Sequence, residues 1–209
     1  RMVGRRRGQS PRLRAPLAQG AGRGRHAILR ARHDRRTQHG VRDGGWKEFY
    51  DNGELKAEGT YDKGVKTGEW NFYHPNGKLE QTGKYDSKGR LTGQWVWYYS
   101  SGNLLREENY IKGLADGMMA EYDEDGNIIT EGEYIEGFEE GPWIYQYGDF
   151  KEEGSYSYGY RNGYWKYFDN EGKLLFEGEF IDNNPNGKHL YYWDNGKVKD
   201  EINYLMGMK

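Results

Sequence analysis

The chain has 209 residues, of which 34% are apolar and 31% charged, a composition that disfavours a thick two-layer hydrophobic core. No stretch approaches the roughly 18 uninterrupted apolar residues of a membrane-spanning helix, and the absence of cysteine excludes disulfides and thiolate metal sites. Aromatic residues reach 16%, with 19 Tyr and 7 Trp, and such large rings can supply burial in a thin sheet.

The net charge of −2 conceals two segments of opposite charge. Residues 1–42 contain 13 Arg, no Lys and one acidic residue, Asp34, which gives +12, whereas residues 43–209 carry −14. High charge, scattered Gly and Pro and the lack of apolar periodicity predict that residues 1–43 are a disordered leader. The basic residues of the leader are all Arg, whereas those of the rest of the chain are mainly Lys. This change in composition indicates that the leader is foreign to the native protein. The alternatives are a disordered tail without a specific role, a nucleic-acid-binding arm and an organelle transit peptide.

From residue 44 onward the chain repeats one pattern, in which Gly-x-Trp is followed by an aromatic residue, Asn-Gly, Leu, Gly and Tyr. The copy that starts at Gly68 reads GEWNFYHPNGKLEQTGKYDSKGRLT. A repeat of this length indicates stacked supersecondary units, none of which buries its apolar face alone. We therefore predict one continuous array over residues 44–209. Its seven units begin at Gly44, Gly68, Gly93, Gly117, Gly141, Gly163 and Gly187.

Each unit is predicted to be a β-hairpin, because Asn-Gly or a similar pair stands between two runs of aromatic and β-branched residues. A three-residue loop at residues 75–77 would pair Tyr73 with Leu79. The same rule predicts the pairs Phe49–Leu55 and Tyr98–Leu104. Seven such hairpins give an all-β fold, an elongated antiparallel meander of about 14 strands in a single sheet.

Alternation along the strands predicts which side chains share a face of the sheet. On the return strand the Leu, Gly and Tyr positions, such as Leu79, Gly83 and Tyr85, have the same parity and are expected on one face. A glycine between two apolar positions leaves space for a neighbouring ring. Glu108 and Ile202 occupy that glycine position in two units, so these units are expected to pack differently there.

Two units differ in length from the usual 24 residues. The unit from Gly141 has 22 residues and loses two of them at residues 147–150, which preserves the alternation and leaves a tight Gly-Asp turn. The unit from Gly68 has 25 residues, with the additional one in the loop 86–90. Met119 and His189 take the Trp position in units four and seven.

The repeat resembles a known family. Its order, Tyr-x-x-Gly-x-x-x-Gly-x-Trp-x-x-Tyr-x-x-x-Gly-x-Leu-x-x-x-Gly-x-Tyr, is similar to the bacterial variant of the MORN repeat (membrane occupation and recognition nexus) in YwqK-type antitoxins. The stretches from Tyr61 to Trp70 and from Tyr134 to Trp143 match it, and the resemblance covers residues 44–209. It implies a protein that neutralises a partner. The similarity to eukaryotic MORN arrays implies a scaffold that associates with membranes and phosphoinositides.

The sequence contains no arrangement typical of an enzyme or a metal site, since His-Glu-x-x-His, Gly-x-Ser-x-Gly and Walker-type loops are absent. We therefore predict no catalytic residue, no metal and no cofactor. Our candidate binding residues are the Trp column and two acidic groups, one of three residues and one of two. They are Trp46, Trp70, Trp95, Trp143, Trp165, Asp123, Glu124, Asp125, Glu139 and Glu140. The structural alternative is that the rings pack unit on unit and the acids solvate turns and edges.

These observations favour a non-enzymatic protein-interaction scaffold, with antitoxin-like or immunity-like neutralisation of a basic protein partner as its specific form. The acidic excess favours a basic partner and disfavours nucleic acid and anionic lipid. A membrane-associated or phospholipid-associated scaffold is the alternative, and glycan binding by exposed rings is the third hypothesis. The lack of an apolar secretory-signal segment favours a cytoplasmic location, with export as the alternative because the native N-terminus is not established.

Overall fold

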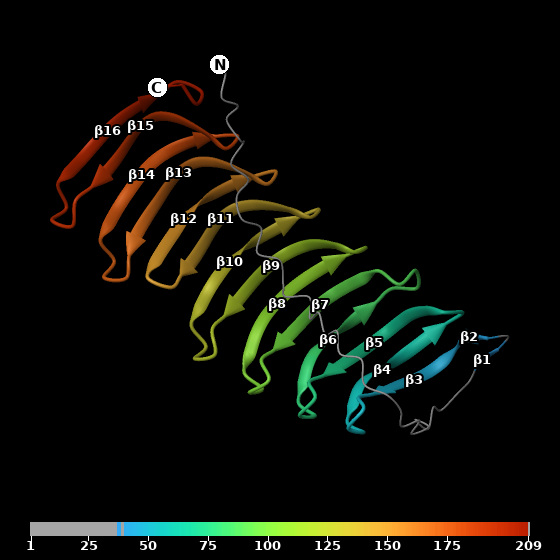
Figure 1. Cartoon of the computed structure of the whole chain (residues 1–209). Coiled ribbons are helices and arrows are strands. Elements are labelled where there is room, and N and C mark those ends of the chain that lie inside the picture. The colour runs from blue at the N-terminus through green and yellow to red at the C-terminus, as the bar shows by residue number, and fades with distance from the viewer. Residues whose placement is uncertain (1–36, 39, 209) are drawn as a thin grey trace, which may run out of the picture. The chain divides into compact units, whose positions relative to one another are not determined.

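The computed structural model describes residues 37–38 and 40–208, which form β-strands and the turns between them (Figure 1). β1 (Thr37–Gln38) and β2 (Val41–Arg42) pair as a small antiparallel ribbon. The other fourteen strands form a single antiparallel sheet. They are β3 (Gly44–Phe49), β4 (Leu55–Asp62), β5 (Val65–Tyr73), β6 (Leu79–Tyr85), β7 (Leu91–Tyr98), β8 (Leu104–Ile111), β9 (Leu114–Tyr122), β10 (Ile128–Ile135), β11 (Phe138–Tyr147), β12 (Phe150–Ser157), β13 (Tyr160–Asp169), β14 (Leu174–Ile181), β15 (Asn184–Tyr192) and β16 (Val198–Tyr204).

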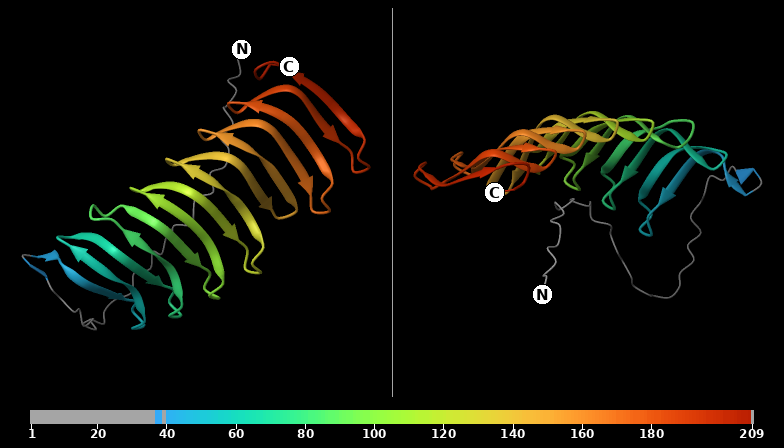
Figure 2. Two further views of the ribbon diagram at one scale, coloured as in Figure 1. Left: turned by 180° about the vertical axis from the view of Figure 1, so that it is seen from behind. Right: turned by 90° about the horizontal axis from the view of Figure 1, so that it is seen from above.

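The fourteen strands lie in chain order from β3 to β16, so the sheet is an open meander in which each strand pairs only with its neighbours in sequence. Figure 2 shows its strands bowed and the sheet curved. The predicted all-β meander of seven hairpins is confirmed. The predicted disorder of residues 1–36 lies outside the described residues. Val41 and Arg42, which the sequence analysis assigned to the leader, belong to β2.

One margin of the sheet, which we call the turn margin, carries the short turns that follow the even-numbered strands (upper right in Figure 1). At Lys63 and Gly64 both residues have positive φ, 47° and 86°, as a two-residue type I′ turn requires. The Gly64 N–H donates to the carbonyl oxygen of Arg42 at 2.8 Å, so the turn is bonded to its neighbour along the margin. Equivalent bonds join Gly113 to Leu91, Gly137 to Ala115 and Gly159 to Glu139.

The opposite margin, which we call the loop margin, carries the connections within each hairpin. In the loop 75–77 the N–H of His74 donates to the carbonyl oxygen of Lys78 at 2.8 Å, and Gly77 has a φ of 80°. The predicted three-residue loop is therefore confirmed, since only glycine adopts that conformation without strain. The predicted pairs are confirmed as well: Phe49–Leu55, Tyr73–Leu79 and Tyr98–Leu104.

Pairing at the loop margin corrects one expectation about the faces. Leu79 pairs with Tyr73, but the next pair joins Phe72 to Gln81, so the return strand has one extra residue at this point. This β-bulge puts Leu79 out of phase with Gly83 further along the strand. The prediction that they share a face was wrong, because the alternation was counted through the bulge.

One face of the sheet, which we call the ring face, is held together by rings seated on glycines. The ring of Trp165 in β13 covers Gly154 of the preceding strand, where an added Cβ would lie 2.1 Å from the ring. The indole N–H of Trp165 donates to the carbonyl oxygen of Ser155 at 3.1 Å. Each hairpin thus fills the space left by the glycine of the hairpin before it. The other pairs are Trp70 on Gly59, Trp95 on Gly83, Trp143 on Gly132 and His189 on Gly178.

Tyrosine rings continue the packing along the ring face. Tyr61 meets Trp46 and Trp70 edge-on, with centroid distances of 5.8 and 5.0 Å. Edge-to-face contacts of this kind contribute about 0.5–1.5 kcal/mol each beyond the burial of their area. The rings are therefore the core of a sheet that is one layer thick. The same contacts recur at Tyr85, Tyr134 and Tyr156.

We call the contact between a ring and the glycine of the preceding hairpin a joint. Between the third and fourth units a different pair of residues forms the joint. Glu108 stands at the glycine position and Met119 at the Trp position, and the two are cross-strand partners with exposures of 3% and 5%. The flexible, unbranched Met side chain leaves room for the carboxylate. Glu108 accepts hydrogen bonds from Arg106 and Tyr110, both at 2.7 Å. The expected difference in packing at Glu108 is confirmed, as an exchange of both members of the joint.

The two units of unusual length leave the sheet continuous. Tyr147 pairs with Phe150 across a two-residue turn, so the β11–β12 hairpin is shortened at the loop margin with its alternation intact. The additional residue of the longer unit lies in the loop 86–90, between the paired Tyr85 and Leu91. Both predicted positions are confirmed.

Candidate functional site

Four of the predicted Trp sites lie inside the packing of the sheet, with exposures of 1% or less. They are Trp70, Trp95, Trp143 and Trp165. A glycine covers one side of each ring, and in two cases a cation covers the other. The Nζ of Lys66 lies 4.4 Å from the ring centroid of Trp70, and the guanidinium carbon of Arg161 lies 4.2 Å from that of Trp165. Rings enclosed in this way hold hairpins together and offer no free surface to a partner.

Trp46 in β3 keeps partial exposure. Arg42 of β2 lies over its ring, 4.4 Å from the centroid, and donates a hydrogen bond to the Tyr61 hydroxyl at 3.0 Å. These contacts tie β2 to the array, so the packed structure begins before the predicted boundary at residue 44.

The acidic cluster 123–125 belongs to a loop at the loop margin. Asp123 accepts backbone N–H bonds from Asp125 and Asn127 at 2.9 and 2.8 Å, so it shapes its own loop. The bond from the Asn127 side chain, together with the backbone bonds, holds the pKa of the Asp123 carboxyl below its usual value. Glu124 and Asp125 point to solvent.

Glu139 and Glu140 are neighbours in β11 but lie on opposite faces. Glu139 pairs with Tyr134 on the ring face, and Glu140 pairs with Glu133 on the other. Glu140 also accepts the backbone N–H of Tyr158, in the next turn, at 2.8 Å. The structure therefore joins Glu140 to Glu133, a residue that the sequence analysis did not single out.

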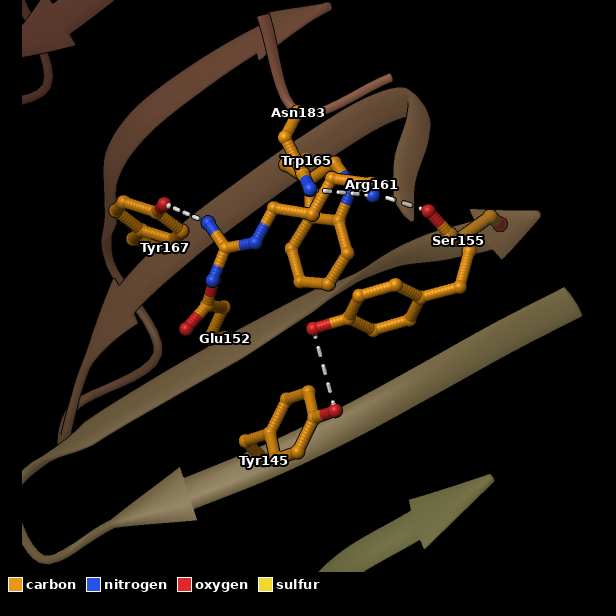
Figure 3. Close-up of polar contacts among 8 residues, drawn as sticks. Tyr145, Glu152, Ser155, Arg161, Trp165, Tyr167 and Asn183 are labelled. Atoms are coloured by element: carbon orange, nitrogen blue, oxygen red, sulfur yellow. Dashed lines mark hydrogen bonds and ion pairs between the residues drawn. The ribbon is translucent and has the colours of Figure 1, made fainter. Parts of the chain in front are cut away.

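A half-buried ion pair lies on the ring face between β12 and β13 (Figure 3). Arg161 contacts the carboxylate of Glu152 and donates a hydrogen bond to the Tyr167 hydroxyl at 2.7 Å. Nearby, the Tyr145 and Tyr156 hydroxyls lie 3.3 Å apart. Burial raises the pKa of Glu152, and Arg161 opposes that rise. Because both charges have partners inside the sheet, we interpret this cluster as packing.

Within residues 40–208, no three His, Asp or Glu side chains converge as metal ligands would. No helix in this part of the chain is long and apolar enough to cross a membrane. A shallow hollow of about 510 Å³ opens beside Trp46, where Lys47 and Glu58 form an ion pair of 3.0 Å. The other acid that lines the hollow, Glu69, is exposed to solvent.

The acidic charge is concentrated in the middle of the array. Residues 107–160, which we call the acidic section, contain 15 Asp and Glu but two Lys, for a net charge of −13. Residues 43–106 carry no net charge, and residues 161–209 carry −1. The sequence analysis missed this concentration because it summed charge over the whole array. A count made unit by unit finds it.

Exposed apolar side chains line the turn margin of the acidic section. Five of them, 48–53% exposed, form what we call the turn-margin row: Ile111, Leu114, Ile135, Phe138 and Tyr160. Ile135 pairs with Phe138 directly beside the ring-face pair of Tyr134 and Glu139. Because side chains alternate between faces, the row lies on the opposite face, which we call the acidic face.

A row of carboxylates lies two residues inward of the turn-margin row, on the same acidic face. Glu133 and Glu140 are direct cross-strand partners, and like charges placed opposite each other are destabilising. Asp116 holds the corresponding position one hairpin earlier, where it accepts the N–H of Glu136 at 3.1 Å. Within residues 40–208 none of these three acids forms an ion pair with Lys or Arg.

The seated rings and the turns define one repeating unit, and comparison with protein families identifies it. The family described as MORN repeat variant matches residues 42–63, 66–87, 91–112, 115–136, 161–182 and 185–205, well over half of the chain. The chain belongs to the MORN repeat variant family. No curated protein matches the chain as a relative.

One MORN-type hairpin of the structure has no counterpart among these matches. Residues 137–160 lie between two matched repeats and contain the shortened β11–β12 hairpin. Its Trp143 nevertheless sits on Gly132 as the other rings sit on their glycines. MORN repeats generally form non-enzymatic scaffolds and interaction modules, which is the general class of this array.

We expect the MORN array to lose stability steeply above pH 10. Burial, the larger cause in each case, raises the pKa of Tyr73, Tyr134 and Tyr147 to about 12. In the unfolded chain these phenols ionise near pH 10. Their contribution to stability is therefore complete below pH 10 and is lost as the pH rises from 10 to 12. Thermal unfolding followed at pH 9, 10 and 11 should show the midpoint falling, with phenolate absorbance appearing together with unfolding. An unchanged midpoint would contradict this.

Proposed function

We propose that this MORN array is a non-enzymatic scaffold that binds a basic protein and neutralises it in the manner of an antitoxin or immunity protein. The observation that carries the proposal is the charge of −13 in the acidic section, between flanks that carry almost none. A field of this kind raises the association rate of a cationic protein and directs it to the middle of the array.

The state of the carboxylates supports the same conclusion. Glu133 and Glu140 repel each other and have no cationic partner among the described residues. A Lys or Arg from a partner would relieve this repulsion. In the flanking section, by contrast, a partner would first have to break ion pairs such as Lys47–Glu58, at 3.0 Å.

Capture from a native lysate tests the proposal. The tagged full-length chain is expected to retain a basic protein in stoichiometric amount and to release it as salt rises, because screening weakens such contacts. The variant Glu133→Gln/Glu140→Gln should lose most of this protein. The matched control, Glu54→Gln/Glu80→Gln, removes the same charge from the neutral flank and should retain it. Recovery of no basic protein, or equal loss in both variants, would contradict the proposal.

Membrane association is the second candidate, because side chains like those of the turn-margin row enter lipid surfaces. The carboxylates beside the row oppose contact with anionic lipid. Flotation with neutral and with anionic vesicles separates the two functions: binding to vesicles without a protein partner would favour the membrane. The enclosed Trp rings count against glycan binding, since they offer no free face to a sugar.

A further inference from the structure

We propose that the turn-margin row and the carboxylates beside it are the docking site for a cationic amphipathic helix of the partner, lying across the hairpins of the acidic section. This inference rests on the proposed function and adds the place of contact and the form of the occupant. It joins two features that coincide in residues 107–160, the exposed apolar row and the unneutralised acids.

The apolar row supplies the area for contact. Leu114 and Phe138 are each 53% exposed although each touches the next turn, since a Cβ added at Gly137 or Gly159 would lie within 3.6 or 3.4 Å of them. The turns thus set the apolar side chains of successive hairpins in one strip along the margin. Such strips are uncommon on monomeric surfaces and mark sites of interaction.

The acids supply the charge that the occupant must complement. Asp116, Glu133 and Glu140 run parallel to the strip, on the same face and toward the sheet interior. A segment that places apolar side chains on the strip therefore meets carboxylates along one flank. Lys or Arg on that flank would satisfy them, which gives both affinity and orientation.

The backbone of the turn margin argues against an extended occupant. The turn N–H groups already donate to the preceding hairpin, as Gly137 does to Ala115 at 2.8 Å and Gly159 to Glu139 at 2.9 Å. An added strand would find no partners there and would leave its own N–H and C=O groups unpaired over apolar side chains. A helix satisfies its backbone internally, so only its side chains need to match the surface.

The spacing of the strip fits a helix. Successive hairpins are two strands apart, or about 9.6 Å at the usual strand separation. Residues seven apart on a helix return to the same side after about 10.5 Å. The mismatch of about 1 Å per hairpin is small enough for one helix to reach three successive turns.

Charge argues against two alternative occupants. The acidic section of a second array, at −13, would be repelled by the acidic section of the first. An anionic lipid surface would be repelled by the same carboxylates. The complementary occupant is a protein segment that is apolar on one side and basic beside it.

Binding of a synthetic peptide to the full-length chain tests the inference. The probe is a fluorescent helix of about 18 residues with Leu at heptad spacing and Lys beside it, roughly 27 Å long. A peptide of the same composition, shuffled so that Leu is spread around the helix, is its control. At about 0.15 M salt the ordered peptide is expected to bind and the shuffled one to bind about tenfold more weakly.

Matched substitutions locate the contact. Leu114→Ser/Phe138→Ser should weaken binding of the ordered peptide about tenfold or more, because two apolar contacts are lost. Val65→Ser changes the same hairpin position in the neutral flank and should have no measurable effect. Both sites are exposed, so the variants are expected to fold, which their melting curves will show. Glu133→Gln/Glu140→Gln should weaken binding and reduce its dependence on salt.

Each other outcome is decisive. If Leu114→Ser/Phe138→Ser binds normally while Glu133→Gln/Glu140→Gln does not, the contact is electrostatic alone; the docking inference fails and the proposed function stands. If neither variant weakens binding, or if both peptides bind equally, the acidic face does not recognise the amphipathic pattern of the helix and the inference fails. If anionic vesicles bind the chain and Leu114→Ser/Phe138→Ser abolishes that binding, the occupant of the row is lipid and the inference is overturned.

Discussion

Gly154→Ala is expected to destabilise the array by about 3 kcal/mol, as overpacking of a rigid site does. The new Cβ would lie 2.1 Å from the indole of Trp165, which is fully buried and cannot move aside without losing the hydrogen bond from its N–H to the Ser155 carbonyl. The displaced ring would separate two hairpins, so we expect a lower midpoint and a broader transition in denaturant unfolding, as the loss of coupling between repeats produces.

Gly45→Ala is the matched control for this substitution. Gly45 also lies in a strand of the sheet, but an added Cβ there would meet nothing within 4 Å and its backbone needs no left-handed conformation. Its variant is expected to unfold like the native chain. Equal destabilisation by both substitutions would show that glycine is required for its backbone freedom and not for the seat it gives to a ring.

The second large effect is expected at the joint of Glu108 and Met119. Met119→Trp alone should cost about 2–3 kcal/mol, because the indole would collide with a buried carboxylate. Glu108→Gly alone should cost about 2 kcal/mol, since it leaves a cavity and removes the ion-pair partner of Arg106. The double variant rebuilds the joint used elsewhere, a ring on a bare glycine, and is expected to be more stable than the sum of the two predicts.

A double-mutant cycle measured by denaturant unfolding gives the size of this coupling, for which we expect about 2 kcal/mol. Met119→Trp combined with Gly154→Ala serves as the control, because these sites belong to different joints and their effects should add. Additivity at Glu108 and Met119 would mean that each is accommodated separately, and that the joint is not exchanged as a pair.

The architecture could be predicted from the sequence because its signals are local. Asn76-Gly77 selects a hairpin loop, and the register then follows from counting residues to Tyr73 and Leu79. The same counting explains why the two-residue deletion at residues 147–150 was placed correctly. Counting residues gave the wrong face for Leu79 relative to Gly83, because a β-bulge between them changes the alternation and no residue type in the sequence marks it.

The candidate site was harder to predict because it depends on contacts between units. Leu104 and Leu114 each begin a strand, at opposite margins of the sheet, yet Leu104 is half-buried and Leu114 is exposed on the turn margin. The Trp residues were correctly seen as a column, but the glycine that encloses each ring comes from the preceding hairpin and not from its own. The acidic section, by contrast, is visible in the sequence once charge is counted in windows.

Because the ring of one hairpin rests on the glycine of the hairpin before it, the array can gain or lose a repeat by duplication or deletion only if the new neighbours match. In a repeat that has both the Trp and the glycine, the Trp of a copied repeat would cover the glycine of the repeat before it, as it does in the present array. A copy of the repeat that carries Glu108 would bring a Trp onto a carboxylate, and a copy of the repeat that carries Met119 would leave a glycine uncovered. This joint therefore allows these two repeats to be gained or lost only together, while the flanks remain free to change length.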